Sequence, residues 1–503
     1  MNIKAAKQEI IRTVRSYLAK DETGAYLIPR ERQRPVLLMG APGIGKTAVM
    51  HQIAEELGIS LVSYTITHHT RQSAIGLPIV SERVYGGRKY SVTEYTMSEI
   101  VASIYDQIER SGIPEGILFL DEINCVSETL APTMLQFLQY KTFGTHRVPD
   151  GYVIVTAGNP PEYNRSVRDF DIVTLDRLKR LDVTEDFGVW REYALRAGVH
   201  SAVLSYLEIR KERFYSVRAG ISGSRFVTAR GWEDLSDELK VYEKLGFPVT
   251  QEFVQSFLQD PETAEDFTAY YALFEKYRSL YRVPEILAGT VTKGSEQLKN
   301  APFDEKLSLV GLLSGALGQE FRDWNQDLEV QQRVFAILKD LRALVQDGSV
   351  RSVRDWLKEA ERTEQQEIEH RREARLLGRE EERTGHLVCL RLREILEKLA
   401  APAEETSVKQ EYDAVRELFA ASEKARAVRA AAAGQHLTNA LSFLSNTFGE
   451  GQEIVLFLSE IDAGYYSLKF VRANGNEAYY HYNQLLLLRD RRAEIREEVM
   501  KLL

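Results

Sequence analysis

The chain has 503 residues, with 65 Lys and Arg against 74 Asp and Glu, and its formal net charge is −9. A composition that is 44% hydrophobic and 28% charged is typical of globular proteins, and the length predicts about three domains. The acidic balance disfavours a protein whose whole surface binds nucleic acid, although a local basic groove is compatible with it.

The sequence also bears on where the protein resides. Its longest apolar runs fall far short of the roughly 20 residues that span a membrane. The N-terminal segment predicts an amphipathic helix rather than a signal peptide, because Ile10, Val14 and Leu18 share one face. Cys125 and Cys389 are too far apart in sequence to suggest a disulfide framework or a CxxC metal site. We therefore expect a cytoplasmic protein with no membrane span.

Residues 36–160 alternate short apolar segments with helical patterns, which is typical of a parallel sheet with helices on both faces. The expected strands are residues 36–39, 61–67, 116–120 and 152–157. Between the second and third strands, two β-prone segments flank Gly86 and Gly87, and a glycine pair in this position predicts a β-hairpin. A helix over residues 98–109 follows, because Ile100, Val101 and Ile104 recur at helical spacing.

The strongest motif directly follows the first expected strand. The sequence GAPGIGKT matches the phosphate-binding loop pattern GxxxxGK[ST] and precedes a helix. Glycines let the backbone N–H groups face the phosphates, Lys46 reaches the β and γ phosphates, and the Thr47 hydroxyl binds Mg²⁺. The expected phosphate-binding residues are Gly40, Ala41, Pro42, Gly43, Ile44, Gly45, Lys46, Thr47 and Ala48.

Polar residues end two further expected strands. Asp121 and Glu122 follow the apolar run ILFL, where paired carboxylates would be costly without a cation. We expect Asp121 to bind Mg²⁺ and Glu122 to act as the base that polarises the attacking water. Asn159 ends the strand TAGN and has a side chain short enough to contact the γ phosphate and that water. Together these residues predict nucleotide hydrolysis rather than binding alone.

The remainder of the chain is expected to be mainly helical. From residue 187 to 289 a helical stretch carries many aromatic residues, which we interpret as core. Residues 351–384 mix charges of both signs, as in a solvated helix or helical hairpin, and an alanine-rich stretch at 414–433 extends a charged helical arm of about residues 351–434. We expect the segment after residue 454 to fold as a small terminal unit.

The motifs GAPGIGKT, ILFLDEIN, TAGNP, LDRLKR and TARGWEDL occur in this order between about residues 20 and 290. In this respect the chain resembles the MoxR-type AAA+ ATPases of the helix-2-insert branch. The resemblance implies an α/β P-loop NTPase core with an all-α lid. The implied domains are residues 1–185 for the core, 186–290 for the lid and 291–503 for a mainly helical C-terminal region.

The resemblance assigns further residues. It predicts that Asn159 is sensor 1, that Arg230 is sensor 2 of the lid, and that Arg177 is the arginine finger that acts on the adjacent subunit. Three other arginines compete for the finger role: Arg165, Arg168 and Arg180. It also predicts that the hairpin around Gly86 and Gly87 is the helix-2 insert and that residues 141–148 are the pre-sensor 1 hairpin.

The resemblance also implies that the nucleotide is ATP rather than GTP and that the metal is Mg²⁺. It implies a ring of subunits as well, by analogy a hexamer, because an arginine finger supplied in trans requires a neighbouring subunit. It further implies a protein client, possibly a separate protein with a von Willebrand factor A domain, for which the ATPase acts as a maturation chaperone. Two alternatives remain open. The first is a nucleic-acid motor or defence-system NTPase, because Arg83, Arg88 and Lys89 on the hairpin could hold a phosphate backbone. The second is a nucleotide-gated scaffold that does not hydrolyse the nucleotide.

Overall fold

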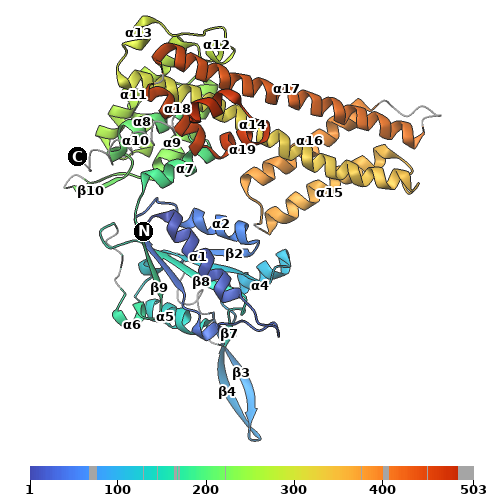
Figure 1. Ribbon diagram of the computed structural model, residues 1–503. Helices are drawn as coiled ribbons and strands as arrows, with labels where there is room; N and C mark the ends of the chain where they lie inside the picture. Colours follow the sequence, from blue (N-terminus) through green and yellow to red (C-terminus); the bar gives the residue numbers. More distant parts are fainter. Residues whose placement is uncertain are drawn as a thin grey trace, which may run out of the picture. The chain divides into compact units, whose positions relative to one another are not determined.

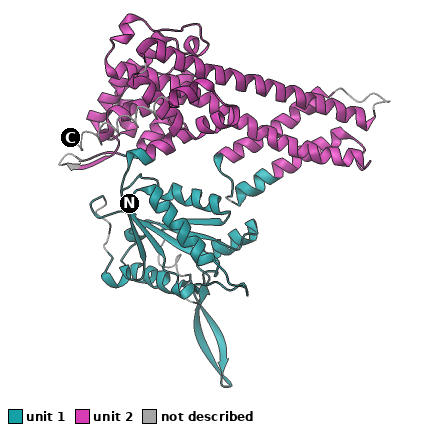
Figure 2. Cartoon of the chain, in the orientation of Figure 1, with its two compact units in different colours: residues 1–189, 228–230, 367–379 teal, residues 190–227, 231–366, 380–503 magenta. Residues whose placement is uncertain are grey.

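The computed structural model describes residues 1–484, except residues 67–75, 129, 144, 164–166, 168–169, 221–222, 375, 400–406 and 450. The chain forms two compact units, coloured separately in Figure 2. Unit 1 comprises Met1–Val189, Thr228–Arg230 and Glu367–Arg379, and unit 2 comprises Trp190–Val227, Gly231–Gln366 and Glu380–Leu503. No helix in these described parts is long and apolar enough to cross a membrane.

Unit 1 is built on a five-stranded sheet in the order β2-β5-β8-β1-β9, in which every neighbouring pair is parallel. The strands are β1 (Val36–Gly40), β2 (Ser60–Thr65), β5 (Gly116–Asp121), β8 (Tyr152–Gly158) and β9 (Lys179–Val183). β1 and β8 are buried along their whole length, because helices cover parallel sheets on both faces. The predicted parallel α/β core is confirmed, and edge strand β9 is an addition that the apolar runs did not predict.

Helices of unit 1 cover the sheet (Figure 1). They are α1 (Ile3–Leu18), α2 (Lys46–Leu57), α4 (Glu99–Ser111), α5 (Ala131–Tyr140) and α6 (Ile172–Leu175), with 3-10 turns η1 (Arg30–Arg32) and η3 (Ile123–Cys125). Ile104 of α4 and Phe137 of α5 join Leu118 and Ile154 of the sheet in one buried core. α1 and α2 pack on each other, and α2 contacts β2 and β5.

A two-stranded hairpin, β3 (Pro78–Tyr85) and β4 (Arg88–Tyr95), projects from unit 1 (Figure 1). Gly86 and Gly87 have φ of 56° and 80° and form the two-residue turn, as the glycine pair predicts. A shorter hairpin, β6 (Thr142–Phe143) and β7 (His146–Arg147), follows α5 in the predicted position of the second hairpin.

The described residues of unit 2 are mainly helical and include a hairpin. The helices are α7 (Phe187–Ala197, beginning in unit 1), α8 (Ser201–Ile209), η4 (Lys211–Arg213), α9 (Ala229–Leu245, also beginning in unit 1), α10 (Gln251–Phe257), α11 (Pro261–Tyr281), α12 (Val283–Leu287), α13 (Glu296–Lys299), α14 (Phe303–Gln346), α15 (Val353–Glu373, ending in unit 1), α16 (Arg379–Lys398), α17 (Val408–Phe448), α18 (Gln452–Ala463) and α19 (Tyr465–Asn474). The prediction of a continuous helical stretch from 187 to 289 is wrong at β10 (Ser216–Gly220) and β11 (Gly223–Val227), which pair antiparallel.

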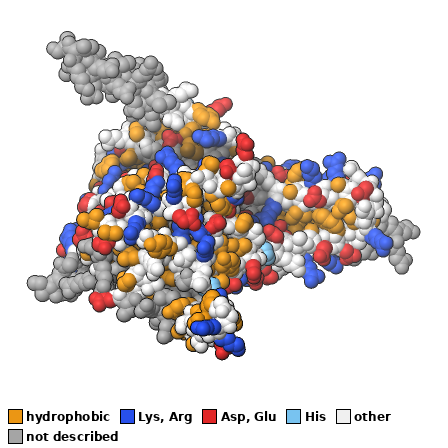
Figure 3. All heavy atoms as spheres, turned by 90° about the horizontal axis from the view of Figure 1, so that it is seen from below, with side chains coloured by type: hydrophobic (Ala, Val, Ile, Leu, Met, Phe, Trp, Pro, Cys, Tyr) orange, Lys and Arg blue, Asp and Glu red, His pale blue; other side chains and the backbone are white. Residues whose placement is uncertain are grey.

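Two long helices organise unit 2. α14 has 44 residues and α17 has 41, and they contact each other, while α18 and α19 pack on α14. Val334 of α14, Leu357 of α15, Leu392 of α16 and Val415 of α17 belong to one buried cluster that holds the arm of these helices together. Side chains of both charge signs alternate with hydrophobic ones over the surface of the elongated arm (Figure 3).

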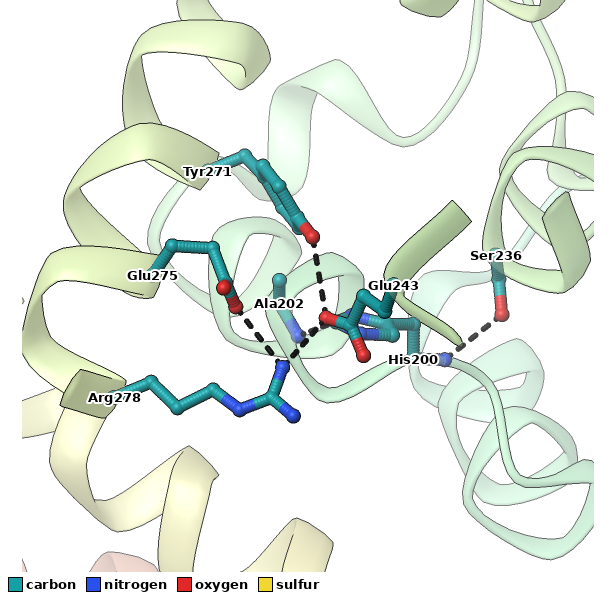
Figure 4. Close-up of polar contacts among 7 residues, drawn as sticks. All are labelled: His200, Ala202, Ser236, Glu243, Tyr271, Glu275 and Arg278. Atoms are coloured by element: carbon teal, nitrogen blue, oxygen red, sulfur yellow. Dashed lines mark hydrogen bonds and ion pairs between the residues drawn. The ribbon is translucent and has the colours of Figure 1, made fainter. Parts of the chain in front are cut away.

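A partly buried polar cluster ties α8, α9 and α11 of unit 2 together (Figure 4). Oε1 of Glu243 accepts hydrogen bonds from His200 Nε2 at 3.0 Å, Tyr271 OH at 3.1 Å and Arg278 Nη1 at 2.8 Å. His200 Nδ1 accepts from the backbone N–H of Ala202, which places the imidazole proton on Nε2. Burial acts to raise the pKa of Glu243, but the hydrogen bonds from His200 and Tyr271 and the charge of Arg278 lower it to about 2.

Candidate nucleotide-hydrolysis site

The phosphate-binding loop connects β1 to α2, which begins at Lys46. Gly43 and Gly45 have φ of 73° and 92°, a left-handed conformation that side chains disfavour. The free N–H groups and the positive dipole end of a helix N-terminus attract anions. The loop therefore has the backbone geometry that binds phosphate groups.

Lys46 is buried and fully hydrogen-bonded. Its Nζ donates to the carbonyl oxygens of Gly40 and Ala41 and to Oδ1 of Asn159, each at 2.8 Å. Burial lowers the pKa of Lys46 to about 8, although the charge of Asp121 opposes this shift. The ammonium group is thus held between the loop and the end of β8.

Thr47 and Asp121, which the sequence predicts as Mg²⁺ ligands, are in direct contact. Thr47 Oγ1 donates to Asp121 Oδ2 at 2.8 Å, and the backbone N–H of Glu122 donates to Asp121 Oδ1 at 2.9 Å. A hydroxyl and a carboxylate are hard oxygen ligands, and Mg²⁺ takes its remaining ligands from water and substrate phosphates. These residues therefore fit Mg²⁺, which would neutralise phosphate charge when bound.

Glu122 follows β5 directly and has φ of 56°. A left-handed conformation at a non-glycine residue costs on the order of 1 kcal/mol and is concentrated at functional sites. Glu122 also contributes to the electrostatic environment of Lys46. The carboxylate of Glu122 is therefore carried by a left-handed turn directly after Asp121, at the same end of β5.

Asn159 is positioned by a residue that sequence reasoning missed. Nδ2 of Asn124, in the turn η3, donates to the Asn159 carbonyl oxygen at 2.8 Å. Oδ1 of Asn124 is buried with no hydrogen-bond partner among the described residues, and a Cβ at Gly158 would lie 2.6 Å from it. The only sequence signal for Asn124 was its place three residues after Asp121 in the motif DEIN.

The backbone of Arg230 contacts the phosphate-binding loop. Its N–H donates to the carbonyl oxygen of Gly43 at 3.3 Å, and a Cβ at Gly43 would lie 2.8 Å from Cβ of Thr228. The positive charge of Arg230 also contributes to lowering the pKa of Lys46. Arg230 is therefore an exposed cation whose backbone contacts the loop and whose charge reaches Lys46.

The candidate finger arginines differ in their surroundings. Arg177 is exposed in the turn after α6, where its backbone N–H donates to the Thr174 carbonyl oxygen. Arg180 lies on edge strand β9 and pairs with Asp182 at 2.8 Å. Arg165 and Arg168 lie outside the described residues. The Arg177 side chain is thus exposed, whereas Arg180 is paired within its own strand.

The β3–β4 hairpin carries large apolar side chains on both faces. Its exposed members, between 42% and 74% accessible, are Ile79, Val80, Val84, Tyr85, Tyr90 and Tyr95. Its charges are partly neutralised, because Arg83 pairs with Glu94 and Lys89 with Glu82. The hairpin surface is therefore more apolar and aromatic than basic.

These features define the class of domain. Residues 36–175 match the family model described as "ATPase family associated with various cellular activities (AAA)", so the chain contains an AAA domain. Four of the five strands of the parallel sheet, the loop at β1 and the polar ends of β5 and β8 lie within this segment, and edge strand β9 follows it.

Three curated relatives show how far the similarity extends. The replication factor C large subunit of Pyrobaculum neutrophilum is 26% identical over 210 residues, 41% of this chain and 43% of that protein. The same subunit from Methanopyrus kandleri is 25% identical over 226 residues, 42% of this chain and 41% of that protein. A tRNA dimethylallyltransferase of Methylacidiphilum infernorum is 45% identical over 62 residues, 11% of this chain and 19% of that protein. The chain thus spans less than half the length of these relatives.

Proposed function

We propose that the chain is a MoxR-type AAA+ ATPase that hydrolyses ATP in an oligomeric ring and remodels or matures a protein partner. The observation that carries the proposal is the hydrogen-bonded set formed by Lys46, Thr47, Asp121 and Asn159 at the phosphate-binding loop. These groups come from three elements, α2, β5 and β8, and supply what phosphoryl transfer needs: positioning and charge stabilisation.

Each residue of the proposed site has a distinct role. Lys46 and the loop residues Gly40–Ala48 bind the phosphates, and Thr47 and Asp121 hold Mg²⁺. Glu122 accepts the proton of the attacking water, and Asn159 orients that water against the γ phosphate. Arg230 stabilises charge on the nucleotide in the same chain, and Arg177 does so from the adjacent subunit.

The β3–β4 hairpin supports a protein partner. An isolated two-stranded hairpin is marginally stable in water, and exposed apolar patches mark interaction sites. Tyr85, Val84 and Val80 stand exposed on this hairpin, and tyrosine is enriched at protein interfaces. We propose that the client contacts the hairpin and is a separate protein, possibly one with a von Willebrand factor A domain.

We further propose that residues 1–185 act as the ATPase core, residues 186–290 as its lid and residues 291–503 as the region that specifies the client. The free thiols of Cys125 and Cys389 suit a reducing cytoplasm, where we place the protein. A hexameric ring is part of the proposal because Arg177 requires a neighbouring subunit.

A nucleic-acid-associated function is the second candidate. It is favoured by two of the three named relatives, which are large subunits of replication factor C. The ion pairs of Arg83 and Lys89 leave Arg88 as the hairpin cation with no ion-pair partner among the described residues. The β3–β4 hairpin therefore favours the protein client.

Affinity capture with the Glu122→Gln variant in ATP and Mg²⁺ tests the proposal, because slowed hydrolysis holds the ring on its client. We expect a discrete protein to be retained with ATP and released with ADP. Retention of nucleic acid alone would instead support the second candidate. The Lys46→Ala variant, which cannot hold the nucleotide, is the matched control.

A further inference from the structure

A strongly basic segment interrupts the acidic chain. Between residues 210 and 230 there are five arginines and one lysine, and Glu212 is the sole acidic residue. The chain as a whole has a net charge of −9, so the charge of this segment is opposite in sign to that of the whole chain. It contains the β10–β11 hairpin.

Two of these arginines face each other across the hairpin. In the antiparallel register Arg218 lies directly opposite Arg225, which places both guanidinium groups on the same face. Like charges in this position repel and destabilise the pair, so the arrangement has a cost without a ligand. Both side chains are exposed.

The neighbouring cations of the segment are neutralised, but these two are not. Arg210 pairs with Asp266, Lys211 with Glu208, and Arg213 with Asp260 and Glu262. Neither Arg218 nor Arg225 has an ion-pair partner in the part of the chain that the structure describes. The unit 2 surface thus leaves one adjacent pair of cations open to an external anion.

We propose that Arg218 and Arg225 form a binding site for the phosphate groups of a nucleic-acid backbone. The guanidinium fork donates two parallel hydrogen bonds to a phosphate, and two adjacent forks can bind one or two successive phosphates. At the next opposed position of the same face lie Gly220 and Gly223, which have no side chains to obstruct a backbone. The ring of Phe226 belongs to the opposite face of the hairpin, because successive side chains of a strand point to opposite faces, so we expect contact at this site with phosphates rather than with bases.

A phosphodiester chain carries its charge on the backbone itself, so its phosphates can reach the two guanidinium groups without any base-specific contact. The other residues on the face of the two arginines are Ser216, Gly220, Gly223 and Val227. The inference is independent of the proposed ATPase site, because Arg218 and Arg225 are not part of it.

Fluorescence anisotropy of the full chain with a labelled single strand of about 30 nucleotides, as DNA and as RNA, tests the site across a salt series. We expect binding at low salt that weakens as salt rises. In the Arg218→Ala/Arg225→Ala variant we expect affinity to fall about tenfold or more, and the salt slope to decrease by about 1.4, or 0.7 for each lost phosphate contact. Comparison of the two strands shows whether DNA or RNA is preferred.

Two controls make the result specific. Arg88→Ala removes an exposed arginine from the other hairpin and should leave affinity nearly unchanged. Arg218→Lys/Arg225→Lys retains the charge but not the forks, so it should keep most of the salt slope while losing part of the affinity.

Three outcomes would overturn the proposal: no binding at low salt, equal loss in the Arg88→Ala variant, or equal affinity of the wild type for poly-glutamate. ATP hydrolysis without nucleic acid should be the same in the double variant and the wild type. A failure of this inference is therefore separate from a failure of the proposed ATPase.

Discussion

The ammonium group of Lys46 donates a hydrogen bond to Oδ1 of Asn159 at 2.8 Å. This contact joins the start of α2 to the end of β8, and Asn124 holds the Asn159 backbone from the other side. The amide of Asn159 is therefore fixed next to the group that we expect to bind the β and γ phosphates. A side chain placed in this way can respond to the γ phosphate.

Replacing Asn159 by alanine tests that role. We expect kcat for ATP hydrolysis to fall roughly 10²- to 10³-fold, the usual loss for one positioned polar group, while ATP binding is largely retained. Steady-state hydrolysis together with equilibrium binding of a fluorescent ATP analogue separates the two effects. A variant that binds poorly but hydrolyses at the normal maximal rate would show that Asn159 only supports the loop.

Arg177 and Arg180 offer a matched pair for the arginine finger. Arg177→Ala should reduce hydrolysis by about 10³-fold or more, as expected for loss of a finger. Arg180→Ala should have little effect, because an exposed pair such as Arg180–Asp182 contributes about 1 kcal/mol or less. Mixing Arg177→Ala with Lys46→Ala subunits should restore part of the activity, since one subunit supplies the finger and the other the nucleotide site. No recovery on mixing would argue against action in trans.

The tip of the β3–β4 hairpin provides a test of client binding. Tyr85 lies opposite Arg88 in the register, and the Tyr85 and Tyr90 rings are 6.0 Å apart. The Tyr85→Ser/Tyr90→Ser variant should capture at most about a tenth of the client while its basal hydrolysis stays normal, because both side chains are exposed aromatic contacts. Arg88→Ser should leave capture unchanged. The reverse pattern would favour recognition of an anionic partner by this hairpin.

The cluster around Glu243 predicts a pH-dependent contribution to stability. Its pKa is lowered to about 2 in the folded chain, against 4.5 for an ordinary glutamate. The folded state therefore binds fewer protons than the unfolded state in this range, and the stabilisation is complete above about pH 4.5 and lost as pH falls toward 2. The shift corresponds to about 3 kcal/mol at neutral pH.

Urea unfolding of Glu243→Gln at pH 7 and near pH 3 measures this contribution. The variant should be less stable than the wild type by about 2 to 4 kcal/mol at pH 7, since Arg278 loses its better-buried partner, and the difference should shrink by more than half near pH 3. Glu275→Gln is the matched control, because Glu275 is the more exposed partner of the same arginine and its loss should change stability little. An equal difference at both pH values would contradict the assignment.

The centre of the sheet could be predicted from sequence because its strands are buried on both faces. β1, β5 and β8 appear as continuous apolar runs, and the side chains at their carboxyl ends meet at one edge. Edge strand β9, with the sequence KRLDV, escaped detection because its inner side chains are limited to Leu181 and Val183. A short segment with charged residues at alternate positions has the composition of a loop, so it is not recognised as a strand unless its partner strand is known.

Other features depend on contacts that no local pattern contains. The hydrogen bond from Asn124 to the Asn159 carbonyl requires the left-handed turn at Glu122, and a glutamate gives no signal for that conformation. The β10–β11 hairpin lacks the Asn-Gly or Asp-Gly turn that marks short hairpins and is flanked by helical patterns. The contact of Thr228 with Gly43 joins segments far apart in the chain.

We propose Glu122 as the base of the ATP-hydrolysing site. The most direct test is the steady-state rate of ATP hydrolysis with Mg²⁺ for the wild type and Glu122→Gln, with ATP binding measured on the same samples. We predict a loss of at least about 10²-fold in rate with unchanged ATP affinity, because removal of a general base leaves the phosphate-binding groups intact. A Glu122→Gln variant that hydrolyses ATP at the wild-type rate would contradict the assignment.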